Sequence, residues 1–122
     1  MNYILYNGQS IAVYDSGKIL NSVQDVLDIM ATTQYEGGCD AVILYKESLP
    51  EAFFDLKTRF AGEILQKFSN YRMRLAIVGD FSGYTSKALR DFIYECNAGN
   101  RIFWATSEEE AIKMLHNAQY DF

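Results

Sequence analysis

Three short apolar runs constrain the fold of this chain more than any other feature. They are Ala41–Tyr45, Leu75–Val78 and Ile102–Ala105. Each run is too short for a helix, and none shows the polar alternation of a strand with one face in water. Continuous apolar strands are typical of parallel sheets that are covered on both faces. The three runs therefore predict the core of a parallel sheet.

The N-terminal segment predicts an antiparallel addition to that sheet. Residues Tyr3–Tyr6 and Ile11–Tyr14 flank the dipeptide Asn7-Gly8. This dipeptide tolerates the positive φ angles of a type I′ turn, which joins two strands in a tight hairpin. We therefore expect the chain to begin with a two-stranded hairpin.

Amphipathic segments with helical spacing lie between and after the buried strands. They run from Ser22 to Gly37-Gly38, from Pro50 to Phe68, from Ala88 to Gly99 and from Ser107 to Ala118. Ser22 with Asp25, and Ser107 with Glu110, resemble capping boxes at helix starts. The resulting order is ββαβαβαβα. It predicts one α/β domain over residues 1–122, a sandwich with a mixed, mostly parallel sheet of about five strands and about four helices.

Composition and charge exclude several classes of function. The chain has 122 residues and a formal charge of −5, with its Lys and Arg residues scattered. Nucleic-acid binding requires concentrated cations, so no nucleic acid is expected as a partner. We find no leader pattern and no apolar run long enough to span a bilayer, so no membrane partner is expected. The expected location is the cytoplasm.

The metal and redox chemistry open to this sequence is limited. Cys39 and Cys96 are far apart and form no CxxC motif, so free structural thiols are favoured over a redox pair. His116 is the only histidine, and we expect it to be solvated on the polar side of the last helix. Structural zinc requires several Cys or His ligands at short spacing. We therefore expect neither a metal nor a cofactor.

The polar segment Gly79–Lys87 is the clearest candidate site, because it leads from a buried strand into a helix. A helix N-terminus can hold an anion with its backbone N–H groups. The candidate binding residues are Asp80, Ser82, Tyr84, Thr85, Ser86 and Lys87. The segment does not have the spacing of a P-loop. The favoured interpretation is a strand-to-helix turn, with Thr85 or Ser86 as N-cap and Asp80 bonding the loop backbone.

Two further groups of residues have both a structural and a functional interpretation. Glu47, Glu51 and Asp55 could bind a cation or act in acid–base chemistry, but acidic residues also favour the first turn of a helix. The structural interpretation is preferred. Tyr71, Tyr84 and Tyr120 lie in loops or the tail and are candidates for an interface, although most aromatic residues should pack in the core.

Four segments resemble a bacterial family known as domain of unknown function 4180. They are Phe53–Thr58, Ala61–Phe68, Leu75–Ser82 and Tyr84–Lys87. The resemblance spans roughly Ser22 to Leu115. It implies relatives but no established activity.

The order of elements is also similar to the STAS fold of anti-sigma-factor antagonists. In that fold a helix N-terminus carries a phosphorylatable serine in a D-S-[ST]-G pattern. Here Asp55-Leu56-Lys57-Thr58 occupies that place, so the resemblance makes Asp55, Lys57 and Thr58 candidates for partner binding. The serine pattern itself is missing. We therefore do not expect Thr58 to act as a phosphorylation switch.

The favoured hypothesis is a small, non-catalytic cytoplasmic module that binds and regulates another protein. The alternative is a small-molecule or anion-binding protein, or an enzyme, that uses the loop Gly79–Lys87. A concave polar cavity at that loop would favour the alternative, whereas an apolar patch beside the second long helix would favour protein binding. Whether the chain forms a homodimer is left open.

Overall fold

The computed structural model describes residues 1–15 and 17–118 of the chain. In this part of the chain, five strands form one sheet with the order β1-β2-β3-β4-β5. The strands are β1 (Asn2–Tyr6), β2 (Gln9–Val13), β3 (Ala41–Tyr45), β4 (Arg74–Val78) and β5 (Ile102–Ala105). β1 pairs antiparallel with β2, and β2 to β5 run parallel. The predicted mixed, mostly parallel sheet is confirmed.

The hairpin at the N-terminus forms as its turn sequence predicts. Asn7 and Gly8 both have positive φ, at 48° and 84°. These angles match the twist of two antiparallel strands. The register places Tyr6 opposite Gln9 and Ile4 opposite Ile11.

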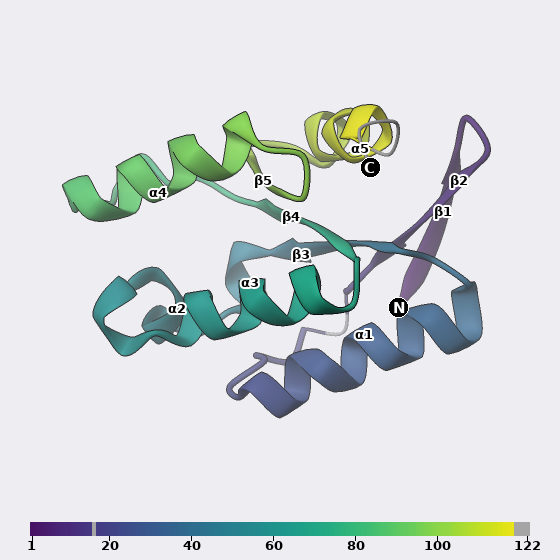
Figure 1. Ribbon diagram of the computed structural model, residues 1–122, viewed down its shortest axis with the longest axis horizontal. Helices are drawn as coiled ribbons and strands as arrows, with labels where there is room; N and C mark the ends of the chain where they lie inside the picture. The colour runs from purple at the N-terminus through teal and green to yellow at the C-terminus, as the bar shows by residue number, and fades with distance from the viewer. Residues whose placement is uncertain (16, 119–122) are drawn as a thin grey trace.

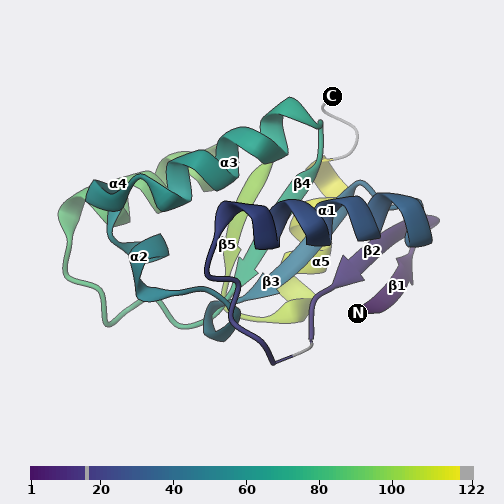
Figure 2. The ribbon, with the colours of Figure 1, turned by 90° about the horizontal axis from the view of Figure 1, so that it is seen from below.

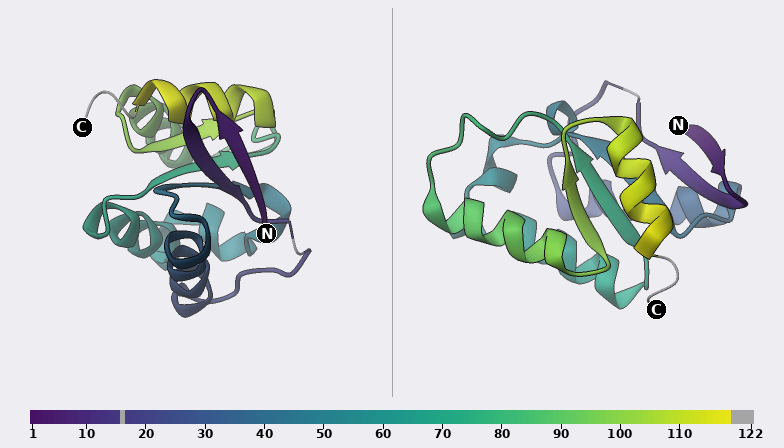
Figure 3. Two further views of the ribbon diagram at one scale, coloured as in Figure 1. Left: turned by 90° about the vertical axis from the view of Figure 1, so that its right-hand side faces the viewer. Right: turned by 90° about the horizontal axis from the view of Figure 1, so that it is seen from above.

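Helices cover both faces of the sheet. They are α1 (Val23–Gly37), α2 (Glu51–Phe54), α3 (Phe60–Asn70), α4 (Lys87–Ala98) and α5 (Glu108–Ala118), with short 3₁₀ turns η1 (Lys46–Ser48) and η2 (Leu56–Thr58). Figure 1 shows α1, α2 and α3 beneath the sheet, Figure 2 shows them in front of it from below, and Figure 3 shows α5 crossing its other face. Neighbouring residues of each parallel strand therefore point into different buried clusters, as Leu75 and Ala76 of β4 do. This arrangement explains why the strand sequences are continuously apolar.

The helix caps follow the local sequence. Ser22 Oγ accepts the N–H of Asp25, and Ser107 Oγ accepts the N–H of Glu110, both at 3.1 Å. Gly38 ends α1 in the left-handed region, with φ 60°. Both predicted capping boxes thus mark helix starts, because each serine satisfies a backbone donor that the helix leaves open.

The helix expected from Pro50 to Phe68 is wrong, because the chain breaks it into three pieces. Arg59 adopts a left-handed conformation, with φ 64°, between η2 and α3. The Asp55 side chain accepts the N–H of Lys57, and Thr58 Oγ1 accepts the N–H of Phe60. Such side-chain bonds compete with regular helical bonding. The break accounts for the additional helix α2.

Arg74 is a buried charge at the beginning of β4. Its side chain is 1% exposed, and one guanidinium nitrogen lies 2.6 Å from Asp40 Oδ1. A second guanidinium nitrogen donates to the carbonyl of Leu115 near the end of α5. Arg74 therefore connects the sheet, the segment before β3 and α5. Buried charges are tolerated in proteins when they are paired and hydrogen-bonded in this way.

His116 differs from its expected position. It is half-buried, and its ring packs edge-on against Tyr6 with centroids 5.2 Å apart. The prediction of a solvated histidine is wrong because the β1–β2 hairpin lies beside the end of α5. Sequence spacing along α5 alone does not show this contact.

Candidate functional site

Asp80 organises the loop that follows β4. Its Oδ1 accepts hydrogen bonds from the Ser82 N–H at 3.0 Å and from the Ser82 hydroxyl at 2.6 Å. These bonds stabilise the ionised carboxylate, and they lower the pKa of Asp80 below its usual value. At the end of the loop, Ser86 Oγ accepts the N–H of Leu89 at 3.2 Å. The predicted loop bond of Asp80 and the predicted N-cap of α4 are both confirmed.

Lys46 joins the loop after β3 to the loop after β4. Its ammonium nitrogen donates to the carbonyl of Asp80 at 2.9 Å and lies 4.9 Å from the ring centroid of Tyr84. Gly79 is required at this crossing, since a Cβ there would lie 2.6 Å from Lys46 Cβ. The contact explains the glycine without invoking an anion.

Tyr84 belongs to an aromatic cluster rather than to an open loop. Its ring stacks on Phe54 of α2 with centroids 5.2 Å apart and planes 22° apart. Burial is the main reason why the pKa of Tyr84 is raised. The cluster also holds Phe81, whose ring is 5.0 Å from Trp104. Tyr84 thus attaches the loop to the core.

A small pocket of about 320 Å³ brings together candidates from two parts of the sequence. Its lining consists of Glu51, Phe54, Asp55, Leu56, Lys57, Tyr84 and Ser86. Asp55 and Lys57 thus meet Tyr84 and Ser86, although about thirty positions separate them in the chain. The carboxylates of Glu51 and Asp55 make this pocket unfavourable for an anion.

The remaining candidate residues lie outside that lining. The ammonium of Lys87 pairs with Asp91 at 2.7 Å, and Thr85 is exposed. Thr58 Oγ1 lies 2.6 Å from the carbonyl of Ala52 and 2.8 Å from that of Asp55. The Thr58 hydroxyl therefore stabilises the turn before α3. Tyr120 lies outside the described residues.

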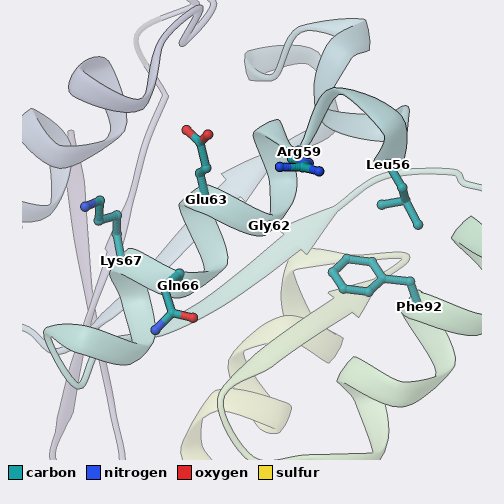
Figure 4. A pocket seen from close by; sticks show the side chains of 7 residues that line it. All are labelled: Leu56, Arg59, Gly62, Glu63, Gln66, Lys67 and Phe92. Atoms are coloured by element: carbon teal, nitrogen blue, oxygen red, sulfur yellow. The ribbon is translucent and has the colours of Figure 1, made fainter.

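A groove lies on the surface between α3 and α4. This groove of about 580 Å³ is lined mainly by apolar surface. Its residues are Leu56, Arg59, Gly62, Glu63, Gln66, Lys67 and Phe92. Figure 4 shows the Phe92 ring of α4 directed toward α3, opposite Gly62. Arg59, Glu63 and Lys67 add charged groups, and their aliphatic stems can extend the apolar surface.

Gly62 keeps the centre of the groove open. Apart from its chain neighbours and the backbone of α3 itself, no atom lies within 4 Å of the position that a Cβ would occupy there. Glycine destabilises a helix interior by roughly 0.5–1 kcal/mol relative to alanine. Its presence in α3 therefore has a local cost and leaves space at the surface. A glycine inside an amphipathic segment is the sequence signal for this groove.

The described part of the chain also bears on three other features, namely metal sites, membrane-spanning helices and disulfides. Among residues 1–15 and 17–118, no three His, Cys, Asp or Glu side chains are grouped to hold a metal ion. Within the same ranges, no helix has the length and apolar character needed to cross a membrane. Cys39 and Cys96 are both free thiols, as predicted. Burial raises the pKa of the Cys96 thiol.

Comparison with known families agrees with the resemblance of the central segments. A family model described as Domain of unknown function (DUF4180) matches residues 6–115. The chain belongs to this family. The DUF4180 match includes both α3 and α4, and hence every residue that lines the groove between them. No curated protein and no solved structure matches the chain. The similarity to the STAS fold therefore stays a prediction.

Tyr45 provides a pH-dependent test of the packing in this DUF4180 domain. Its hydroxyl donates to the carboxylate of Glu108 at the start of α5. Burial, followed by this bond, raises the pKa of Tyr45 from 10.0 to about 12. Between these pH values the unfolded chain releases the proton while the folded chain retains it. The free energy of unfolding should therefore fall as the pH rises from 10 to 12.

Chemical unfolding of the wild type and of Tyr45→Phe measures this effect. The variant cannot lose the proton, so its stability should fall less steeply over the same pH interval. Other tyrosines titrate in both proteins and cancel in the comparison. Equal slopes for the two proteins would contradict the assigned shift.

Proposed function

We propose that this DUF4180 domain is a non-catalytic, cytoplasmic module that regulates a partner protein by binding it in the groove between α3 and α4. The observation that carries the proposal is the groove itself. An apolar surface with Leu56 and Phe92 and a charged border of Arg59, Glu63 and Lys67 suits a protein ligand. The similarity to anti-sigma-factor antagonists supports the same class of function.

The shape of the groove favours an amphipathic helix as the binding element of the partner. Two neighbouring helices form its walls, and Gly62 leaves a gap into which an apolar side chain can fit. Charged groups at the border can pair with polar residues beside that side chain. Such a border contributes more to specificity and association rate than to affinity.

The experiment fills the groove without disturbing the fold. Gly62→Trp places a large ring in open space, while Gly62→Ala adds only a methyl group. Gly62→Ala should increase the free energy of unfolding by about 0.5–1 kcal/mol, because alanine favours the helix. Gly62→Trp should fold with a stability near that of the wild type.

Binding is measured by quantitative mass spectrometry of proteins captured from a lysate of the native host. Proteins that bind in the groove should be retained by the wild type and by Gly62→Ala, and lost with Gly62→Trp. The direct affinity of each such protein should fall at least tenfold with the tryptophan. Equal capture by all three proteins would refute the groove as the binding site.

Asp80→Ala serves as the control for the alternative site. Its carboxylate bonds the loop, so the variant should retain the captured proteins as long as it is folded. A loss of capture with Asp80→Ala but not with Gly62→Trp would move the site to the loop Gly79–Lys87. A thermal melt of each variant establishes that the proteins compared are folded.

A further inference from the structure

One edge of the sheet is blocked against a further strand, and the other is open to one. At the β5 edge, the side-chain amide of Asn97 donates to the carbonyl of Trp104 at 3.1 Å and accepts its N–H at 2.8 Å. This amide imitates one pair of the bonds that a neighbouring strand would make. Helix α4 lies beside β5 in Figure 1 and carries Asn97. The edge is therefore blocked against another strand.

Within residues 1–15 and 17–118, the β1 edge carries neither of two common protections, charge and proline. β1 is the outermost strand at the other end of the sheet (Figures 2 and 3). Its sequence, Asn-Tyr-Ile-Leu-Tyr, contains no proline and no charged residue. Leu5 is 76% exposed and Tyr3 is 39% exposed, and both point to the same face because side chains alternate along a strand. Natural proteins usually interrupt such an edge with charge, proline or a bulge.

We propose that β1 is a dimer interface, at which the β1 strands of two copies of this chain pair antiparallel around a two-fold axis at Ile4. In this register Ile4 faces the Ile4 of the second copy. Tyr3 faces its Leu5, and Leu5 faces its Tyr3. The exposed apolar side chains then meet as two cross-strand pairs, and the two five-stranded sheets become continuous.

Charge favours a second copy at this edge over other parts of the surface. Each chain carries a net charge of −5, so two copies repel one another wherever acidic surfaces meet. β1 contains no ionised side chain at neutral pH, and the antiparallel register brings no like charges into opposite positions. The interface is separate from the groove between α3 and α4. It therefore adds to the proposed function without depending on it.

Light scattering after size exclusion tests the proposal with the full chain. The wild type should have twice the 14.0 kDa mass of one chain. Leu5→Lys should reduce the mass to that of a single chain, because it places two ammonium groups at the interface. Tyr94→Lys is the matched control, since Tyr94 is 77% exposed on α4, and it should leave the dimer intact.

Single-chain mass for the wild type at concentrations up to about 1 mM would overturn the proposal, since weaker association is not a specific interface. A dimer that persists with Leu5→Lys and an unchanged melting temperature would also overturn it. Loss of the dimer with Gly62→Trp instead would assign self-association to the groove. That result would reject the β1 interface and would identify a second copy of this chain as the partner that binds in the groove.

Cysteine crosslinking tests the register. Ile4→Cys should form an intermolecular disulfide under mild oxidation, because directly opposite residues bring their Cβ atoms within about 5.5 Å. Leu5→Cys should crosslink at least tenfold more slowly, since its counterpart in the second copy is diagonal to it. Wild-type protein measures the background from Cys39 and Cys96. Faster crosslinking of Leu5→Cys would overturn the two-fold axis at Ile4.

Discussion

Replacing Arg74 with alanine should lower the free energy of unfolding by about 3–5 kcal/mol, the cost typical of removing a large, fully buried side chain. Arg74 is 1% exposed and connects β4 to Asp40 and to the carbonyl of Leu115. The change leaves a cavity and removes the donor that satisfies that carbonyl. Urea unfolding followed by circular dichroism gives the loss directly.

Arg74→Met is the matched control for this prediction. Methionine refills most of the volume without introducing a charge, so its cost should be less than half that of alanine. Asp40→Ala keeps the guanidinium buried and removes its carboxylate partner. It should therefore destabilise the protein more than Arg74→Met does. A loss below about 1 kcal/mol for Arg74→Ala would show that the connection contributes little.

Replacing Phe53 with alanine should have an effect of similar size, again about 3–5 kcal/mol. Phe53 is fully buried, and its ring lies 5.2 Å from Phe54, 6.3 Å from Phe60 and 5.9 Å from Trp104. These contacts join α2, α3 and β5 in one cluster. The cavity left by alanine cannot be filled by a local shift of one side chain.

Near-ultraviolet circular dichroism of Trp104 reports on the same cluster. Its signal should weaken in folded Phe53→Ala, because the indole loses a packed neighbour. Phe53→Leu keeps more of the volume and should cost about 1–2 kcal/mol. Tyr94→Ala removes an aromatic ring that is 77% exposed and should change the stability little. A similar loss in Tyr94→Ala and Phe53→Ala would contradict the role assigned to burial.

The order of strands in the sheet explains why candidate residues from two parts of the sequence line one small pocket. Asp55 and Lys57 reach the same pocket as Tyr84 and Ser86 because β3 and β4 are parallel neighbours. Their following segments therefore leave the same edge of the sheet. The sequence indicates that Gly79–Lys87 follows a buried strand, but it does not show that Tyr84 stacks on Phe54.

The groove between α3 and α4, in contrast, depends on how two helices pack and not on the order of the strands. Glu63, Gln66 and Lys67 are polar residues of the amphipathic segment Pro50–Phe68 that line the surface of the groove. Whether their face of α3 is open or covered depends on the position of α4. The ring of Phe92 on α4 is directed toward α3 (Figure 4). Only the packing of the two helices creates the hollow.

The amino-acid sequence by itself determined the features that depend on neighbouring residues. Asn7-Gly8 specifies the hairpin through its positive φ angles, Ser22 and Ser107 specify helix starts, and continuous apolar runs specify strands buried on both faces. Tertiary structure decided the burial of Arg74, the contact of His116 with Tyr6 and the difference between the two sheet edges, whereas the break at Arg59 follows from local side-chain bonds that compete with helical bonding. Each of these depends on groups that are distant in the chain or on competing local bonds. Long-range contacts and local hydrogen bonds have comparable energies, so spacing in the sequence does not determine which of the two forms at a given position.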